Sequence, residues 1–432
     1  MALATAQPTY RLTRTPGGAR VIVAPMRERA SVSLSLMVAA GSRHEPAERA
    51  GIAHFLEHIV FKGGHRYPSA RLVSEAVESV GGSLNAATDE ETTTFWAKVP
   101  EAHLQLAAGV LADIVFSPVL EEAEVVKERG VVIEELRMYR DSPSDHVNTL
   151  FDEVMWPGHA FGRDVAGTEA TVATFTAADC RDFLRQGYGA RNLVVSIAGA
   201  VDENQAAAAV AEMLDTAWGD GGRPDPGPVP AAAAAERLRF EGRRTQQVNL
   251  MLGCRAGGYA DDDRYAVDVL NTVLGEGMAS RLFLEVRERL CLAYEVHSFA
   301  IKHSDTGALA IFVGCEPKRV EAAVVAVRSE LQRLVREPVA DDELRRAQAA
   351  MTGRLSLQLE STSALASYLG EQELLTDEIL TPEEVARRID AVTAADLQRV
   401  ARRLCADGLR AAAIGPLRRP ERLIALLGEP LL

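Results

Sequence analysis

The sequence repeats its own pattern once, and this duplication restricts the chain to folds that can be built from two similar units. The segment TAAD at 176–179 opens an amphipathic run, and the same four letters recur at 393–396, 217 residues later. Upstream, an alternating segment at 31–41 (SVSLSLMVAAG) matches another at 247–257 (QVNLMLGCRAG) at an offset of 216. Because two independent matches agree to within one residue, we predict an internal repeat of one structural unit.

A segment rich in glycine, proline and alanine separates the two copies. It reads GDGGRPDPGPVPAAAAA over 219–235, a composition typical of an extended linker. We therefore predict two homologous domains, at 1–217 and 238–432, joined by a linker at 218–237. In each copy the TAAD helix leads into an apolar strand and a final helix.

Strands with a period of two lie among helices of roughly 10 to 20 residues in both copies. The stretch SLNAATDEETTTFWAKV at 83–99 alternates polar and apolar residues, as an antiparallel strand with one solvated face does. A doubly wound parallel sheet would instead need longer apolar strands in strict alternation with helices. The predicted fold class is therefore α+β, with two α/β-layered domains whose sheets are mainly antiparallel.

Charge and composition exclude several classes of function. The 432 residues carry a formal net charge of −14, so a polyanionic partner such as nucleic acid would meet net repulsion. No stretch approaches the roughly 20 apolar residues that cross a bilayer, and the first residues lack an apolar signal-peptide core. The five cysteines are scattered without a C-x-x-C pair, which indicates reduced thiols. We expect a soluble, cytoplasmic protein that binds neither nucleic acid nor membrane.

The candidate catalytic residues lie on one predicted helix, in the segment AHFLEHIVFKGG at 53–64. His54 and His58 are four residues apart, so their side chains project from the same face, one turn apart. Two imidazoles held in this way suit a tetrahedral zinc ion. Glu57 lies beside them, where it can act as general base on a metal-bound water. A catalytic zinc needs a third protein ligand, which the order H-x-x-E-H places far away in the sequence.

Two motifs together carry a family resemblance, GIAHFLEHIVFKG at 51–63 and ERGVVIEEL at 128–136. They resemble the pitrilysin-type, or inverzincin, zinc metallopeptidases of family M16, which include the mitochondrial processing peptidases and bacterial half-length homologues. The resemblance implies one zinc ion per chain, with Glu135 as third ligand, separated by 76 residues from the second histidine. Glu134 competes by adjacency, but the family register and the two-turn step from Glu128 favour Glu135. Glu128 would orient a histidine or the metal-bound water from outside the ligand set.

The same resemblance implies substrate-binding residues. Asn85 and Ala86 lie in a segment, 82–88, that is similar to the family's edge strand, onto which an extended peptide adds by main-chain hydrogen bonds. Asn85 would hold a substrate carbonyl or amide near the zinc, although a turn after the preceding glycine pair explains it equally well. Phe55 would line the pocket for the side chain next to the cut, although an aromatic residue at this spacing is as often part of a core.

The second half resembles the family's substrate-binding stretch at 280–298 (SRLFLEVRERLCLAYEVHS). In that family an arginine and a tyrosine seven residues apart touch the peptide and stabilise the oxyanion, and Arg287 and Tyr294 match them. A cation and a phenol suit this role because the tetrahedral intermediate develops negative charge. Without the resemblance they are a helix-surface arginine and a strand tyrosine. The chain departs from the family pattern at two positions. Cys291 replaces a glycine that is usual in this stretch, and Gly64 replaces a threonine that is often found after the F-K-G turn.

The duplication also predicts which half bears the metal. At an offset of 216 the three motif residues fall on apolar positions of the second copy, namely Leu270, Val273 and Leu274. The second copy therefore keeps the helix without the ligands. We expect the first half to bind metal and the second half to bind and enclose the substrate.

Chain length and the resemblance together imply an assembly. In this family a chain of such length supplies two of the four domains that close around a peptide, so we expect a homodimer or a heterodimer with a related chain. Arg287 and Tyr294 would then act across the interface, on the zinc-bearing half of the partner. The predicted function is zinc-dependent endopeptidase activity on peptides or flexible segments enclosed in a chamber, with Glu57 as general base. The alternative is a non-catalytic scaffold or regulatory subunit of a heteromeric peptidase.

Overall fold

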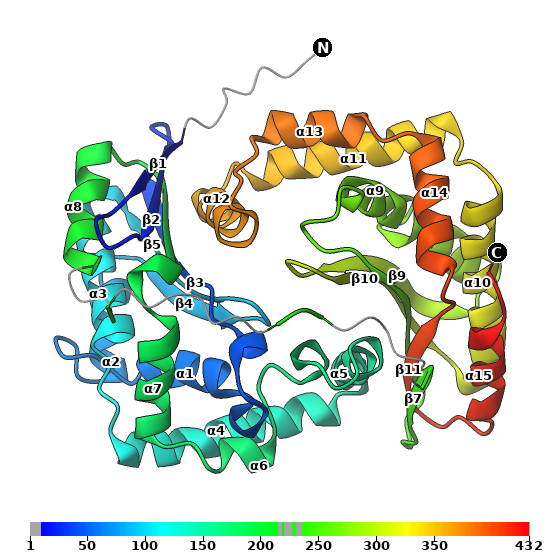
Figure 1. Ribbon diagram of the computed structural model, residues 1–432, viewed down its shortest axis with the longest axis horizontal. Helices are drawn as coiled ribbons and strands as arrows, with labels where there is room; N and C mark the ends of the chain where they lie inside the picture. Colours follow the sequence, from blue (N-terminus) through cyan, green and yellow to red (C-terminus); the bar gives the residue numbers. More distant parts are fainter. Residues whose placement is uncertain (1–9, 215–217, 220–226, 230–235, 432) are drawn as a thin grey trace. The chain divides into compact units, whose positions relative to one another are not determined.

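The structure, a computed structural model, describes residues 10–214, 218–219, 227–229 and 236–431 (Figure 1). The chain divides into two compact units. The first comprises Met1–Leu136, Asp164–Gly227 and Ser356–Glu383, and the second comprises Arg137–Arg163, Pro228–Leu355 and Glu384–Leu432. Most of the predicted linker at 218–237 lies outside the described residues. Within the described ranges, no helix combines the length and the apolar character that crossing a membrane requires.

The first unit contains a six-stranded sheet in the order β1-β2-β6-β3-β5-β4. Neighbouring strands are antiparallel except β2 and β6, which are parallel. The prediction of a mainly antiparallel sheet is therefore confirmed here. The strands are β1 Arg11–Arg14, β2 Arg20–Pro25, β3 Ser31–Val38, β4 Ser83–Thr88, β5 Thr93–Pro100 and β6 Leu193–Gly199.

Helices cover both faces of this sheet. They are α1 Ile52–Val60, α2 Ala70–Glu78, α3 Leu104–Phe116, α6 Glu169–Val172, α7 Ala177–Gly187, α8 Glu203–Leu214, α12 Thr362–Thr376 and most of α4 Glu122–Asp141. The even-numbered residues of β3, from Val32 to Val38, enter a core formed with α1, α3 and α7. Met37 points to the opposite face, where it packs with Leu365 and Leu369 of α12. The period-two pattern of β3 thus supplies an apolar surface on each side of the sheet.

The second unit repeats this topology with one strand fewer, in the order β7-β11-β8-β10-β9. Here too one pair, β7 and β11, is parallel and the others are antiparallel. The strands are β7 Leu238–Glu241, β8 Val248–Ala256, β9 Ala293–Lys302, β10 Gly307–Cys315 and β11 Arg410–Ile414. The helices are α5 Pro143–Met155, α9 Arg264–Gly275, α10 Val320–Arg336, α14 Ala394–Cys405, α15 Pro420–Gly428 and most of α11 Asp341–Gln358 and α13 Pro382–Asp390. This order is the one that a duplicated unit predicts.

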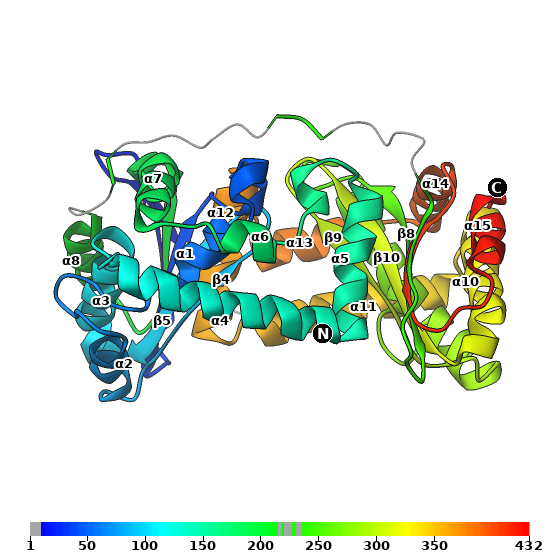
Figure 2. The ribbon, with the colours of Figure 1, turned by 90° about the horizontal axis from the view of Figure 1, so that it is seen from below.

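The compact units differ from the predicted halves because each copy gives one helix to the other. α5, from the first half of the sequence, packs on β8 and β11 of the second unit (Figure 2). α12, from the second half, packs on β3 and β6 of the first unit. The boundaries at 1–217 and 238–432 therefore do not coincide with the compact units. Repeats in a sequence identify equivalent helices, but they do not reveal on which sheet each helix packs.

Both TAAD segments begin helices, as predicted. At the start of α7, Thr176 and Asp179 exchange side-chain and backbone hydrogen bonds, and Thr393 and Asp396 do the same at the start of α14. The segment before β9 differs from an ordinary helix, because Phe283–Arg289 forms a π-helix.

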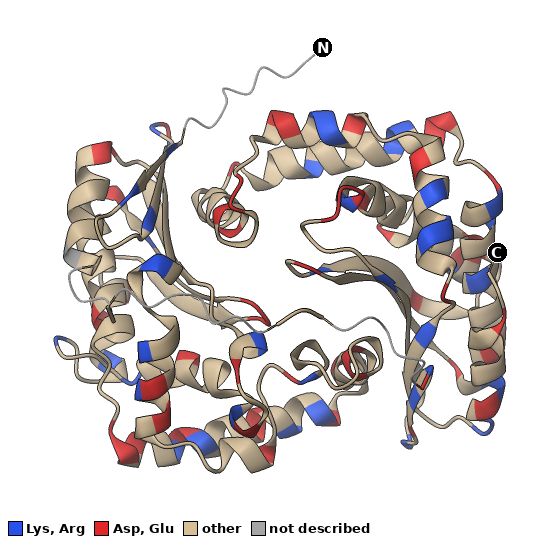
Figure 3. Cartoon of the chain, in the orientation of Figure 1, with Lys and Arg blue, Asp and Glu red and all other residues tan. Residues whose placement is uncertain are grey.

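Acidic and basic residues are interspersed along the helices of each unit (Figure 3). On α14, Arg399 bonds the carboxylates of Asp263 and Asp396, and Arg403 bonds that of Asp261. These arginines are therefore neutralised by neighbouring carboxylates within the second unit.

Candidate functional site

The histidine motif lies on α1, whose first turn is fixed by the residues around it. Gly51 precedes the helix with φ +95°, and a Cβ at this position would lie 2.4 Å from the carbonyl oxygen of Ala166. The carboxylate of buried Glu45 accepts hydrogen bonds from the backbone N–H groups of Gly51 and Ala53, each 2.7 Å long. Glu45 thus satisfies donors that the helix itself leaves free. This contact was not predictable from the motif, because Glu45 lies outside it.

The apolar face of α1 turns the motif residues away from the core. The residues that it buries are Ile52, Ala53, Phe55, Leu56, Ile59 and Val60. His54, Glu57 and His58 occupy the remaining face and are only partly covered. The amphipathic pattern of one short helix therefore presents both imidazoles and the carboxylate together.

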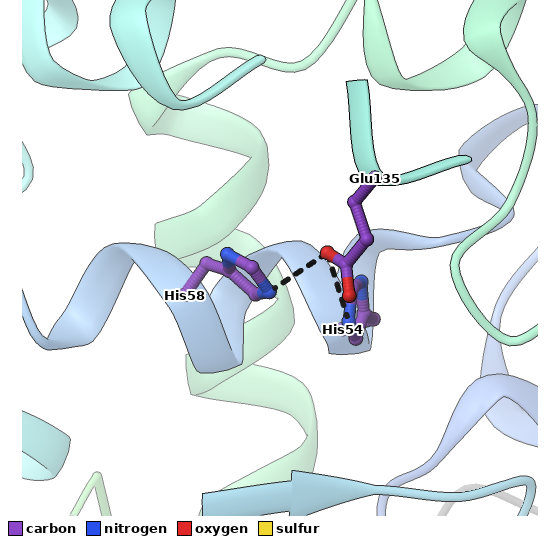
Figure 4. A group of neighbouring side chains, drawn as sticks. All are labelled: His54, His58 and Glu135. Carbon is purple, nitrogen blue, oxygen red and sulfur yellow. Dashed lines mark ion pairs between the residues drawn. The ribbon is translucent and has the colours of Figure 1, made fainter. Parts of the chain in front are cut away.

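His54 and His58 meet Glu135 of α4, as Figure 4 shows. The Nε2 atom of His58 lies 3.3 Å from Oε2 of Glu135, and the Nε2 atom of His54 lies 3.9 Å from the same oxygen. The two imidazole rings are arranged edge to face, with centroids 4.6 Å apart. One ligand atom of each residue lies within 4.8 Å of the others. In the part of the chain that the structure describes, no other three His, Cys, Asp or Glu side chains are grouped in this way.

The three side chains fit a zinc ion. Oε2 of Glu135 is buried and has no hydrogen-bond partner, although two imidazole nitrogens lie close to it. A buried polar atom without a partner is costly unless a bound ligand satisfies it. Two imidazole nitrogens and one carboxylate oxygen form the ligand set of a catalytic zinc site that keeps a fourth position open.

Electrostatics in this group also favour a cation. Burial alone would lower the pKa of His58, but the hydrogen bond with Glu128 and the attraction of the nearby carboxylates of Glu135 and Glu128 raise it to about 9. Burial, and then repulsion from His58, lowers the pKa of His54 to about 4. Around neutral pH the group thus stabilises one extra proton, on His58, and a divalent cation can take that proton's place.

Glu128 and Lys62 hold His58 from behind. Nδ1 of His58 lies 3.1 Å from Oε1 of Glu128, and Nζ of Lys62 lies 2.5 Å from Oε2 of the same carboxylate. Burial opposes ionisation of Glu128, but the hydrogen bonds from His58 and Lys62 lower its pKa. The carboxylate thus binds Nδ1 and leaves Nε2 directed at Glu135. Lys62 was not predicted from the sequence. Its position four residues after His58 could have indicated that it lies near the same carboxylate.

Glu57 lies beside the group formed by His54, His58 and Glu135, but it is not a member of that group. The hydroxyl of Thr88, at the end of β4, donates a 2.7 Å hydrogen bond to Oε2 of Glu57. Burial raises the pKa of Glu57, and this hydrogen bond opposes the rise. A partly buried carboxylate with a raised pKa suits proton transfer near neutral pH. Sequence reasoning also missed Thr88, because nothing in the sequence relates a strand threonine to the motif helix.

The substrate-binding residues predicted in the first half lie in different surroundings. Asn85 is in β4, where it pairs with Trp96 of β5, so it is a strand residue and not a turn residue. β4 is the edge strand of its sheet, and buried Ala86 follows Asn85 in it. Phe55 is fully buried and contacts Phe175 edge to face, with ring centroids 5.3 Å apart. Its ring thus belongs to the core, the second of the two interpretations that the sequence allowed.

Arg287 and Tyr294 come together in the second unit. The guanidinium carbon of Arg287 lies 4.9 Å from the ring centroid of Tyr294, and both residues line a pocket of about 410 Å³. Tyr294 is 75% exposed. Cys291 lines the same pocket and has φ +49°. This left-handed backbone explains why a glycine is usual at the position.

In the second copy of the motif helix, α9, the register differs by two residues from the predicted one. The sequence predicted that three apolar residues of α9 take the place of the motif, namely Leu270, Val273 and Leu274. In the structure these residues are buried and match buried residues of α1 at an offset of 214, not 216. The positions that correspond to the motif are then Asp268, Asn271 and Thr272. They contain no histidine, so α9 lacks a ligand pair in either register.

Two family models match successive parts of the sequence. The model described as Insulinase (Peptidase family M16) matches residues 20–169, which include the whole group around His54, His58 and Glu135. The model described as Peptidase M16 inactive domain matches residues 174–351, which include Arg287 and Tyr294.

Bacterial relatives match nearly the whole chain. An uncharacterized zinc protease of Streptomyces coelicolor is 37% identical over 418 residues, which cover 95% of this chain and 90% of the relative. One of Mycobacterium tuberculosis is 35% identical over 427 residues, 97% of each chain. One of Bacillus subtilis is 33% identical over 405 residues, 92% of this chain and 96% of the relative.

Solved structures show the same fold. A protease from Helicobacter pylori superimposes with a TM-score of 0.84 at 22% identity, covering 94% of this chain and 99% of that one. A peptidase M16 inactive domain from Pseudomonas fluorescens superimposes with a TM-score of 0.86 at 19% identity, covering 94% and 98%.

Proposed function

Because this chain belongs to peptidase family M16, we propose that it is a zinc-dependent endopeptidase that hydrolyses peptides or flexible protein segments. The observation that carries the proposal is the place of Glu57. Its carboxylate lies on the motif helix beside His54 and His58, but it is bonded to Thr88 and is not part of the ligand group. A structural zinc site needs ligands alone, whereas hydrolysis also needs a carboxylate that is free to move a proton.

In this proposal His54, His58 and Glu135 hold one zinc ion per chain. When bound, zinc supplies Lewis-acid polarisation of a water molecule and of the scissile carbonyl group. Glu128 accepts a hydrogen bond from Nδ1–H of His58, so that Nε2 remains available as a ligand atom, and Lys62 balances the charge of Glu128.

Glu57 acts as the general base and then as the general acid. It takes a proton from the attacking water and delivers it to the leaving amine, as the reaction requires one transfer in each direction. Burial raises the pKa of Glu57, which brings the carboxylate closer to the neutral range in which both transfers are efficient. The hydrogen bond from Thr88 fixes one carboxylate oxygen and leaves the other for the proton.

The free edge of β4 is the proposed substrate-binding surface. An extended peptide would add to this edge through main-chain hydrogen bonds, with Asn85 and Ala86 as the contact residues. Since Thr88 of the same strand bonds Glu57, the strand that would hold the peptide also positions the base. Main-chain recognition requires an extended segment, which is why we propose peptides and flexible regions as substrates.

Arg287 and Tyr294 are proposed to stabilise the oxyanion. The guanidinium and the phenol hydroxyl both donate hydrogen bonds, and both are partly exposed at one pocket. We propose that they act on the zinc-bearing half of a partner subunit, so that two chains share two sites around an enclosed substrate. The partner is a second copy of this chain or a related chain.

The decisive test is hydrolysis of a mixed peptide library, followed by mass spectrometry of the products, with and without a chelator. We expect internal cleavages that stop with the chelator and return with zinc. A Glu57→Gln protein should keep its zinc and lose the cleavages. A chain that binds zinc but cleaves nothing would instead be the non-catalytic scaffold or regulatory subunit.

Sharing of active sites has its own test, in which two inactive variants are mixed. After subunit exchange, a heterodimer of Glu57→Gln and Tyr294→Phe chains contains one site with both changes and one with neither. Activity should return to about a quarter of the wild-type value if subunits assort randomly. No recovery, with exchange verified by native mass spectrometry, would refute shared sites between two copies of this chain.

A further inference from the structure

Phe283 is an aromatic residue that does not serve the core. It is half-buried at the start of the π-helix Phe283–Arg289. Among the residues that the structure describes, it belongs to none of the hydrophobic clusters of the second unit or the first. A single apolar side chain at a partly open surface is common, so any role of Phe283 must be read from the contact that it makes.

The contact that Phe283 does make is with the guanidinium of Arg287. The guanidinium carbon lies 4.7 Å from the centroid of the Phe283 ring and 4.9 Å from that of Tyr294. Both distances are within the range of cation–π attraction. Phe283, Arg287 and Tyr294 therefore form a stack in which the cation contacts two rings.

Other restraints on Arg287 are weak. Within the described part of the chain it has one ion pair, a contact of 3.8 Å with the carboxylate of Glu288, whose side chain is 58% exposed. An exposed ion pair of this length contributes little to fixing a side chain. The two rings are therefore the groups that define where the guanidinium lies.

The π-helix places the stack. The backbone N–H of Leu290 bonds the carbonyl of Glu285, five residues earlier, so the turn is wider than in an α-helix. Phe283 and Arg287 are four residues apart and project on the same side, toward the strand that carries Tyr294. Single π-helical turns are rare and occur often at functional sites, where they direct a side chain.

We infer that Phe283 is a positioning residue that holds the guanidinium of Arg287 against Tyr294, at the pocket where both face a substrate. This inference rests on the proposed function and extends it, since the family resemblance assigns a role to Arg287 and Tyr294 but none to Phe283. Without the ring, Arg287 would sample other rotamers and donate to the oxyanion less often.

The stack can be measured without any substrate, by the rate at which phenylglyoxal modifies Arg287 in the full-length protein. Peptide mass spectrometry follows this residue alone. Loss of a partly exposed cation–π contact in Phe283→Leu should raise the rate by about two- to fivefold, and Phe283→Tyr should keep the wild-type rate. The matched control is Leu284→Ala, which removes the neighbouring exposed side chain and should change nothing. An unchanged rate in Phe283→Leu would overturn the inference.

Peptidase kinetics then separate positioning from a general structural effect. Phe283→Leu should lower kcat and kcat/KM by the same factor, about two- to fivefold, because the oxyanion contact is made in the transition state. In an Arg287→Ala background the same substitution should have no further effect, whereas a merely structural role would give an additive loss. If the wild-type protein cleaves no peptide, the proposed function fails, and the phenylglyoxal result still decides whether the stack exists.

Discussion

The helices α1 and α9 occupy equivalent places beside two sheets of the same topology, yet they use their polar faces differently. In α9 each polar residue at the motif positions is bonded within the second unit. Asp268 pairs with Lys302 at 2.5 Å, Asn271 accepts from the Ser298 hydroxyl at 2.6 Å, and Thr272 donates to Glu276 at 2.6 Å. In α1, Glu128 and Thr88 hold His58 and Glu57 from behind, whereas Nδ1 of His54 and Oε2 of Glu135 have no hydrogen-bond partner.

This difference indicates how a functional site is distinguished from a structural polar cluster. Hydrogen bonds among buried polar groups offset the cost of removing them from water, and a fold that needs nothing more satisfies them all, as α9 does. An atom left without a partner, such as Oε2 of Glu135, lowers stability unless a ligand completes it. The same scaffold thus carries a closed polar cluster in one copy and an open candidate metal site in the other.

Glu57 and Asn271 occupy equivalent positions, but substitutions at the two should have opposite effects, one on kcat and the other on stability. Glu57→Gln removes the proposed base, so kcat should fall by about 10²- to 10⁴-fold while zinc content and melting temperature stay near wild type. Asn271→Ala removes the side-chain acceptor of the Ser298 hydroxyl, at 2.6 Å, and leaves it the backbone carbonyl of residue 271, at 3.2 Å, so the melting temperature should fall while kcat of the folded protein is unchanged. Calorimetry measures the melting temperature of both variants, and steady-state kinetics measures their kcat. A large loss of kcat in Asn271→Ala would abolish the functional contrast between the helices.

Zinc affinity should distinguish two adjacent glutamates of α4 even more directly. Glu135→Gln removes a proposed ligand and should weaken zinc binding by more than about 100-fold, since loss of a partner outside a ligand set already costs about 10- to 100-fold. Glu134→Gln changes the same functional group one residue away, where the side chain is exposed, and should bind zinc as the wild type does. Competition with a chromophoric chelator measures both. Equal losses in the two variants would contradict the assignment of Glu135.

Local patterns in the sequence predicted those parts of the fold that depend on local physics. The alternation in β3, the TAAD caps of Thr176 and Thr393 and the amphipathic face of α1 are each set by residues a few positions apart. The exchange of α5 and α12 was not predictable in this way, because two equivalent amphipathic helices can pack on either of two equivalent sheets.

For the candidate site too, local features could be predicted from the sequence, whereas most contacts between distant residues could not. The spacing of His54 and His58 is a local property, and the family resemblance supplied the distant Glu135. Lys62 and Thr88 were missed, because a lysine after a helix and a threonine in a strand resemble ordinary surface residues until the fold brings them to Glu128 and Glu57. The offset of 216 failed at α9 for a related reason, since the buried positions of β3 and β8 are 216 residues apart whereas those of α1 and α9 are 214 apart.

Zinc binding should depend on pH through one proton. His58 has its pKa raised to about 9, so zinc must displace a proton below that pH, whereas His54, with its pKa lowered to about 4, is already neutral. The affinity should therefore rise about tenfold for each pH unit through the neutral range and level off above about pH 9. In Glu128→Gln one of the groups that raise the pKa is lost, so the plateau should begin at lower pH. Titration calorimetry in buffers of different ionisation enthalpy counts the proton, and pH-independent affinity around neutrality would be inconsistent with this arrangement.

The smallest predicted effect concerns the hydroxyl–carboxylate pair that each helix makes. The hydrogen bond from Thr88 opposes the rise of the Glu57 pKa that burial causes, so Thr88→Ala should let this pKa rise further. A base with a higher pKa is protonated over a wider acidic range, so the acid limb of kcat/KM should move to higher pH, with a loss of a few-fold near neutrality that recovers at alkaline pH. Thr88→Ser retains a donor and should keep the wild-type profile. Thr272→Ala removes the hydroxyl–carboxylate pair that α9 makes with Glu276, and should leave the profile unchanged. A shift of equal size in Thr88→Ala and Thr272→Ala would mean that the profile reports general stability, and that Thr88 does not tune the base.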